Sequence, residues 1–243
     1  MKIGSDFEKI EWNFQGFQLL EPNAFIGDMI ISVLVIYLVF KLKRLKVKST
    51  FNTYWLWFFI VFGLGFLTGG FGHLLYNYTG IPGKIPSYFT GILAVYFIEH
   101  AMFSIHPNPK QKKLFNKISV YKLVLVLILE TLICLFVDLE SNPTKGMALP
   151  TINSVIGMGF SLGYLGYQYY KKIHSSFRYL LISTFILLPS AIFLAFKINI
   201  HPWLDKNDVS HLLLIVSIIL YYVCIKQYSD FVSRESGLAV SES

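Results

Sequence analysis

The chain has 243 residues, of which 54% are hydrophobic and 14% are charged, and its formal net charge is +7 at pH 7. A soluble domain carries about 25% charged residues, so this composition argues against an ordinary soluble enzyme. The basic residues lie in short segments beside apolar runs, a pattern that sets the orientation of a membrane protein and differs from the basic face of a nucleic-acid-binding protein. We therefore expect no nucleic-acid partner.

Residues 1–21 precede the first apolar run. They hold two lysines and four acidic residues, namely Asp6, Glu8, Glu11 and Glu21. A signal peptide has a basic start that is followed directly by an apolar region, and this segment lacks that order. We interpret it as a short acidic arm outside the membrane, which could lie at the membrane interface through Trp12, Phe14 and Phe17.

Seven apolar stretches follow, and each has about the length that a membrane-spanning helix needs, roughly 20 residues. They cover residues 24–40, 53–76, 87–105, 119–137, 149–170, 177–198 and 208–228. The third stretch ends at His106–Pro109, where prolines stop a helix. The sequence predicts an all-α membrane protein, with a seven-transmembrane-helix bundle at residues 22–229 and a disordered tail at residues 230–243.

The loops between these stretches alternate in charge. Basic clusters follow the first, third and fifth predicted helices, at residues 41–48, 110–117 and 171–172. Basic loops stay on the cytoplasmic side of a membrane. We therefore expect the N-terminus outside, the C-terminus in the cytoplasm, and a multi-pass protein of the plasma or inner membrane.

Five ionisable residues are predicted at the outer end of the bundle, namely Asp28, His73, His201, Asp208 and His211. Asp208 and His211 are three residues apart, so they share one helix face. Imidazole and carboxylate groups are zinc ligands, and a catalytic zinc site uses three of them with a water molecule. The alternatives are that Asp208 caps its helix and that His73 bonds to a backbone carbonyl.

Two short motifs carry a family resemblance. Gly69–His73 closes the second helix, and Asn207–His211 opens the seventh, which ends in a tyrosine pair. The chain resembles the CREST superfamily of alkaline ceramidases, adiponectin and progestin receptors and Per1-type proteins. It is most similar to an uncharacterised seven-helix branch with an Asn-Asp-x-x-His signature. The resemblance implies a seven-helix fold, zinc held by His73 and His211, and hydrolysis of lipid amides or esters.

The sequence departs from that superfamily at three positions. Gly69 stands where the better-known members have a serine, and Asn207 stands where they have a histidine. Residues 87–90 hold no carboxylate where those members have an aspartate. A third metal ligand must therefore come from elsewhere, or the site is empty.

Two glutamates are predicted deeper in the bundle. Glu99 lies about three-quarters along the third helix, and Glu130 lies past the middle of the fourth. A carboxylate at membrane depth is protonated, paired or facing water, and proton-coupled transporters use such groups. The alternative is a neutral glutamate that is hydrogen-bonded to a neighbouring helix.

Three hypotheses follow from these residues. The first is a zinc-dependent membrane hydrolase of a lipid amide or ester, with His73, His211 and Asp208 on the metal, and His201 or Asp28 as a further ligand or base. Asp208 and His201 would be its catalytic residues, and membrane lipids its partners. The second is a small transporter or ligand-sensing bundle that uses the two deeper glutamates. The third is a non-catalytic membrane scaffold or effector.

Overall fold

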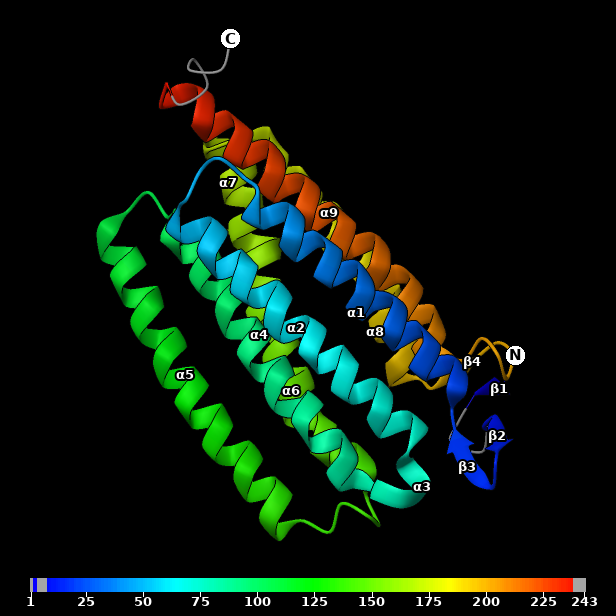
Figure 1. Cartoon of the computed structure of the whole chain (residues 1–243). Coiled ribbons are helices and arrows are strands. Elements are labelled where there is room, and N and C mark those ends of the chain that lie inside the picture. The colour runs from blue at the N-terminus through cyan, green and yellow to red at the C-terminus, as the bar shows by residue number, and fades with distance from the viewer. Residues whose placement is uncertain (1, 4–7, 238–243) are drawn as a thin grey trace.

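The computed structural model describes residues 2–3 and 8–237, and its main elements are long helices (Figure 1). The long helices are α1 (Pro22–Lys43), α2 (Thr50–Leu74), α4 (Ile85–Ser104), α5 (Pro109–Phe136), α6 (Pro143–Met158), α8 (Arg178–Ala195) and α9 (Lys206–Glu235). A π-helix, η2 (Gly159–Leu165), joins α6 to α7 (Gly166–Lys172) without a break. The short turns are α3 (Tyr76–Thr79), η1 (Ile81–Lys84) and η3 (Ser175–Phe177).

Among the described residues, five helices are long and apolar enough to cross a membrane, by length and composition. They are α1, α2, α5, α9 and the combined segment of η3 and α8, each with a mean hydropathy of 1.6 or more in its most apolar part. This is consistent with a multi-pass membrane protein. The expected all-α class is confirmed, whereas the count of seven spans stays a prediction.

The helices pack in two groups that meet where α1 packs against α2. Helix α4 lies against α2, α5 and α6, while α9 lies against α8 and α1. Figure 1 shows α5 at the edge of the bundle. Large aromatic side chains fill the centre because edge and tilted ring contacts pack densely. Trp55 of α2 and Tyr221 of α9 are fully buried, with ring centroids 5.6 Å apart.

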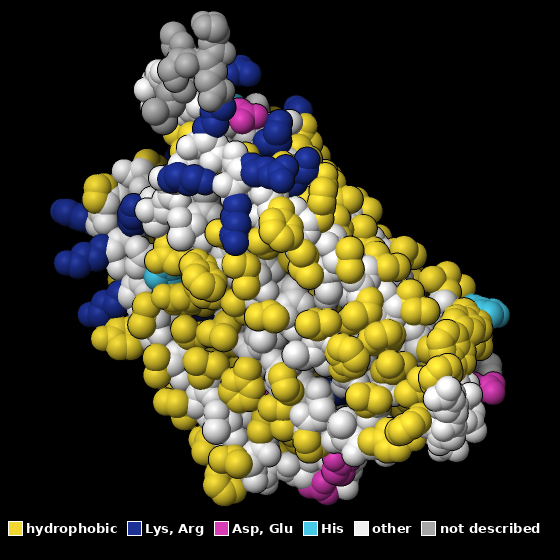
Figure 2. Space-filling model, in the orientation of Figure 1, with side chains coloured by type: hydrophobic (Ala, Val, Ile, Leu, Met, Phe, Trp, Pro, Cys, Tyr) yellow, Lys and Arg dark blue, Asp and Glu magenta, His cyan; other side chains and the backbone are white. Residues whose placement is uncertain are grey.

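The surface repeats the pattern of a membrane protein. Figure 2 shows Lys and Arg side chains gathered at the end where α9 finishes, and hydrophobic side chains over the flank below them. Many large hydrophobic residues of the helices are exposed, among them Val33 of α1 at 67% and Phe185 of α8 at 69%. An apolar surface of this extent marks contact with lipid or protein rather than with water.

Two helices are longer than the sequence predicts. Helix α5 begins at Pro109 and not near Ser119, because the Asn108 side chain caps it by accepting hydrogen bonds from Lys110 N and Gln111 N. The residues that follow also favour a helix, since proline suits the first helical position and lysine is a good helix former. Helix α9 continues to Glu235, since no breaker interrupts it. The predicted disordered tail is therefore wrong for residues 230–235, and residues 238–243 lie outside the described part.

The fifth predicted helix is also divided. The structure replaces one helix at 149–170 by α6, η2 and α7, with Pro150 inside α6. π-Helical segments are rare in proteins, and those that do occur are often found at functional sites. The glycines do allow close packing, as the sequence indicates: a Cβ added at Gly157 would lie 2.3 Å from Cγ1 of Val95 on α4.

The predicted acidic arm contains a hairpin. Strands β2 (Glu11–Phe14) and β3 (Phe17–Leu20) pair antiparallel, with Glu11 opposite Leu20 and Phe14 opposite Phe17. Strands β1 (Lys2–Ile3) and β4 (Ile198–Asn199) pair separately. The hairpin leads directly into α1, and we call this end of the bundle the hairpin end.

Candidate functional site

Ionisable side chains from α1, α2, α9 and the residue before α1 gather at the hairpin end, and we call them the hairpin-end cluster. Its members are Glu21, Asp28, His73, Asp208 and His211. The cluster contains two separate histidine–carboxylate contacts, each between groups on different elements. Glu21 and Asp28 are both buried, with 5% and 4% exposed.

The first contact joins α9 to α1. His211 Nε2 lies 3.1 Å from Asp28 Oδ1. Two glycines make room for it: a Cβ at Gly27 would lie 2.4 Å from His211 Nδ1, and a Cβ at Gly70 would lie 2.9 Å from the Asp28 Cβ. The edge of the His211 ring also contacts Phe66. Within the described residues His211 Nδ1 is buried without a hydrogen-bond partner, because it faces the α1 backbone at Gly27.

The second contact joins α2 to the residue before α1. His73 Nδ1 lies 2.7 Å from Glu21 Oε2, and Lys9 Nζ lies 3.1 Å from Glu21 Oε1. Burial alone would raise the pKa of Glu21. The hydrogen bond to His73 and the positive charges of His73, Lys9 and Lys84 outweigh burial, so the pKa of Glu21 is far below its usual range. Burial lowers the pKa of Lys84, and the Glu21 charge opposes that shift.

Asp208 has a structural role at the start of α9. The N-cap is Asp205, whose side chain accepts hydrogen bonds from the Asn207 and Asp208 amides. Asp208 completes the capping box by accepting the Asp205 amide at 2.9 Å, and it also accepts a bond from Asn23 Nδ2 at 2.7 Å. This reciprocal arrangement satisfies orphan amides at a helix start. The predicted capping alternative for Asp208 is therefore what the contacts favour.

His201 lies apart from both contacts. It is exposed, its Nδ1 accepts the Trp203 amide at 3.1 Å, and its backbone pairs with Leu204. The predicted partnership of His201 with the metal ligands has no contact to support it in this arrangement.

The donor set of the hairpin-end cluster does not fit a three-ligand zinc site as arranged. His73 and His211 each have their own carboxylate partner, and the remaining nitrogen of His211 faces the α1 backbone. A search of the described residues finds no group of three or more His, Cys, Asp or Glu that could hold a metal. Zinc binding by His73, His211 and Asp208 stays a prediction.

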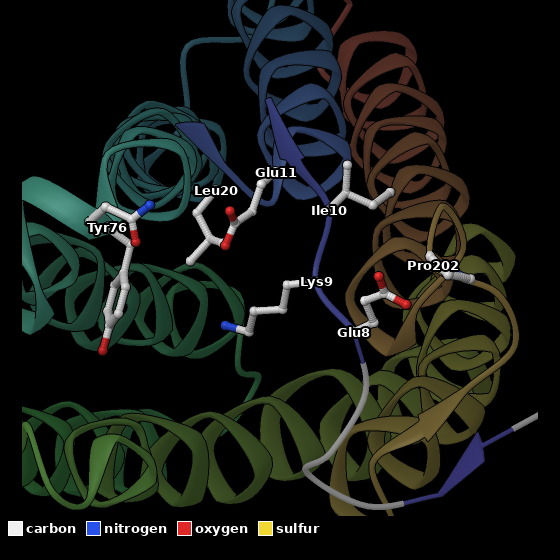
Figure 3. Close-up of a pocket in the computed structure, with 8 residues that line it drawn as sticks. Glu8, Lys9, Ile10, Glu11, Leu20, Tyr76 and Pro202 are labelled. Carbon is white, nitrogen blue, oxygen red and sulfur yellow. The ribbon is translucent and has the colours of Figure 1, made fainter. Parts of the chain in front are cut away.

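A cavity lies beside the cluster, between the N-terminal segment and α3. Its volume is about 850 Å³, and it is lined by Glu8, Lys9, Ile10, Glu11, Leu20, Tyr76, Asn77 and Pro202. Figure 3 shows the Lys9, Glu8 and Glu11 side chains around this open space. Lys9 and Lys84 both lie over the Tyr76 ring, at 5.8 and 4.8 Å from its centroid.

A second polar site lies between α4, α5 and α6. Glu99 of α4 forms an ion pair with Lys122 of α5 and accepts a hydrogen bond from Ser119 Oγ. Glu99 is 4% exposed. The space for this pair depends on Gly157 of α6, because a Cβ there would lie 2.8 Å from Glu99 Oε1 and 3.1 Å from Lys122 Nζ.

Glu130 lies on the same face of α5, about two turns or 12 Å beyond Lys122. Ser119, Lys122, Val126 and Glu130 follow each other at helical spacing, and together with Glu99 we call them the α5 row. Glu130 is completely buried. Its Oε1 accepts a hydrogen bond from Cys134 Sγ at 3.7 Å, and its Oε2 has no hydrogen-bond partner among the described residues.

The structure adds residues that the sequence predictions left out. Lys122 is a charged residue inside an apolar run, and that position alone could have indicated a partner at membrane depth. Glu21 belongs to the predicted acidic arm, and nothing in the local sequence distinguishes its charge from the other acidic residues there. Its burial arises because the hairpin folds back onto α2.

Comparisons with known proteins place the chain in a family without assigning it an activity. No curated protein and no solved structure matches it. A family model described as "Family of unknown function (DUF6962)" matches residues 24–230, which is most of the chain, and the chain therefore belongs to that family.

Proposed function

We propose that the chain spans the membrane seven times, with the hairpin end outside and the C-terminus in the cytoplasm. The five apolar helices support this proposal, and α4 and the continuous α6–η2–α7 segment supply the other two crossings. Lysine and arginine side chains gather at the end where α9 finishes (Figure 2), which the positive-inside rule places in the cytoplasm.

Within that membrane domain we propose the transport of protons across the bilayer, with the α5 row as the proton site. The observation that carries this proposal is Glu130: it is completely buried, and its Oε2 has no partner among the described residues. A charged carboxylate at the bilayer centre costs about 2.5–3.5 kcal/mol or more. An unpaired glutamate there holds a proton, and ionisable residues inside a membrane bundle mark proton relays.

The two glutamates of the row then differ in charge. Lys122 stabilises Glu99 as a carboxylate, whereas Glu130 carries a proton. When Glu130 releases its proton, its new charge requires water or a cation in the α4–α5–α6 interior. Loss of the proton therefore favours a different arrangement of these helices. A transporter needs this link between protonation and conformation.

Purified protein reconstituted into liposomes with an internal pH-sensitive dye tests this function. An imposed pH gradient should decay faster than in protein-free liposomes, and Glu130→Gln should return the decay to the protein-free rate, because the amide keeps the shape and cannot release a proton. Glu235→Gln, at the exposed end of α9, is the matched control and should behave as wild type. Equal decay in wild-type and Glu130→Gln liposomes, or no decay above protein-free liposomes, contradicts the proposal.

A zinc-dependent lipid hydrolase is the second candidate. The feature that favours it is the gathering of two histidines and three carboxylates from the region of α1, α2 and α9 at one end of the bundle, where the superfamily resemblance expects ligands. We derive no catalytic step from it, because each histidine already has a carboxylate partner.

A further inference from the structure

The β2–β3 hairpin has two chemically different faces. Cross-strand partners lie on the same side of a hairpin, and Trp12 pairs with Leu19 while Phe14 pairs with Phe17. These four apolar residues form one face, which we call the aromatic face. The alternate positions, Glu11, Asn13, Gln18 and Leu20, form the other face.

The aromatic face is uncovered in the structure. Phe14 is 63% exposed, Phe17 57% and Trp12 44%. Two further exposed aromatic residues extend it from other segments: Trp203 lies 6.1 Å from Trp12, and Tyr78 lies 5.9 Å from Phe17, between ring centroids. An exposed cluster of this kind on a strand pair would be an aggregation hazard in water.

Leu20 on the opposite face, together with the outer backbone edge of β3, fixes the hairpin to the bundle. Leu20 is buried, the Gln18 amide donates to Tyr78 Oη at 2.9 Å, and Asn77 Nδ2 donates to the Gln18 carbonyl. At the base, the Glu21 amide donates to the Ile10 carbonyl. Glu21 has a φ of 49°, in the left-handed region, where its contacts with His73 and Lys9 hold it. The direction of the aromatic face is therefore set by the fold.

The aromatic face lies next to the start of α1, whose outward residues Ile26 and Ile30 are also exposed. Exposed apolar residues therefore occur both on the hairpin and on the helix that follows it in the chain. Tryptophan and tyrosine are enriched where a bilayer meets water, since their rings suit the headgroup level. Lysine side chains, such as that of Lys9 just before β2, also suit the headgroup level, because the stem is apolar and the end is charged.

We infer that the β2–β3 hairpin is a membrane-interface element, whose aromatic face contacts phospholipid at the boundary between headgroups and acyl chains. The partner is a lipid surface, and the hairpin places the polar cavity of Figure 3 at headgroup level beside it. This inference requires that the helices cross a bilayer, and it is independent of proton transport.

Site-directed spin labelling in phosphatidylcholine vesicles tests it. In a background of Cys134→Ala and Cys224→Ala, a nitroxide is attached at Phe14→Cys, with Phe17→Cys as a second reporter. The matched control is Gln18→Cys on the opposite face, where the backbone, not the side chain, makes the contacts with α3. Val33→Cys on the exposed flank of α1 gives the value for lipid.

The measured quantity is the collision rate of each label with oxygen, which partitions into lipid, and with a water-soluble nickel chelate. We expect oxygen to dominate at positions 14 and 17 and the nickel chelate to dominate at position 18, so the ratio reverses between the two faces. Nickel access at position 14 equal to that at position 18 would place the hairpin in water. Low access of both reagents at position 14 would indicate a protein partner. Either result overturns the inference.

Discussion

The hairpin-end cluster and the α5 row both contain buried carboxyl groups, but these groups differ in whether they have a charged partner. In the cluster, each histidine contacts a carboxylate, and Asp208 completes a helix cap. In the α5 row, Lys122 pairs with Glu99, and Glu130 has a partnerless oxygen among the described residues. Groups with fixed partners mainly hold elements together, whereas a buried carboxyl without a cation partner can hold and release a proton. We therefore interpret the hairpin-end cluster as an anchoring site, which holds elements together, and the α5 row as the working site, which carries the proton.

The first way to sharpen this comparison is to break the ion pair of the row. Lys122→Ala leaves Glu99 buried without a cation, and we expect a loss of about 3 kcal/mol, at the lower end for broken buried pairs because Lys122 is partly exposed. The thermal midpoint in detergent measures it. Lys226→Ala, which removes an exposed pair with Asp230, should cost about 0.5 kcal/mol or less. Equal losses in the two variants would contradict a buried pair.

The second test acts on the cluster through a glycine. Gly27→Ala places a methyl group 2.4 Å from His211 Nδ1, so the ring must move away from its place beside Asp28. We expect destabilisation of about 1–3 kcal/mol, as for overpacked cores, with wild-type proton flux per folded molecule. Gly91→Ala has open space around it and should be neutral or slightly stabilising. Loss of flux in Gly27→Ala would move the working site to the cluster.

A third test uses pH. Because the pKa of Glu21 is lowered on folding, its stabilising contribution is complete above its ordinary value of 4.5 and is lost as the pH falls below that value. Wild type should be more stable than Glu21→Gln at pH 7. The difference should narrow below pH 4.5 by at most about 1.4 kcal/mol per pH unit, the limit for one proton. A stability difference that is constant from pH 7 to pH 3 would show that Glu21 is not an ion-pair partner.

The smallest expected effect concerns metal. If the histidines serve as anchors, elemental analysis of detergent-purified protein should find far less than one zinc per chain, and His73→Ala and His211→Ala should not change that content. One zinc per chain that is lost in both variants and kept in His174→Ala would break the comparison. It would restore the zinc-dependent hydrolase as the first candidate.

The sequence predicted the apolar helices well and their contacts poorly. Hydrophobic length identifies a helix that can cross a membrane, so every predicted stretch corresponds to helix in the structure. A run of lysines beside prolines suggests a loop, whereas lysines are good helix formers behind an Asn108 cap, so the sequence alone places the start of α5 too late. The hairpin was missed because two four-residue strands are too short to stand out in an acidic segment.

The site contacts could not be predicted because they depend on helix rotation and depth. Spacing placed Asp208 and His211 on one face, yet their partners differ: Asp208 contacts Asn23, and His211 contacts Asp28. Both partners lie on α1, and no periodicity within α9 indicates them. The depth of Glu130 is predictable from its place in an apolar run. The sequence cannot show whether a cation lies beside it, because that depends on how α4 and α6 pack around α5.

The most direct test of the central claim is the protonation state of Glu130 in the folded protein. Infrared difference spectroscopy between wild type and Glu130→Gln at pH 7 reports the carbonyl stretch of a protonated carboxyl group. We predict that wild type has this band, that Glu130→Gln lacks it, and that Glu99→Gln keeps it, since Lys122 holds Glu99 as a carboxylate. Identical spectra for wild type and Glu130→Gln in this region would mean that Glu130 is ionised, and would contradict its role as the proton carrier.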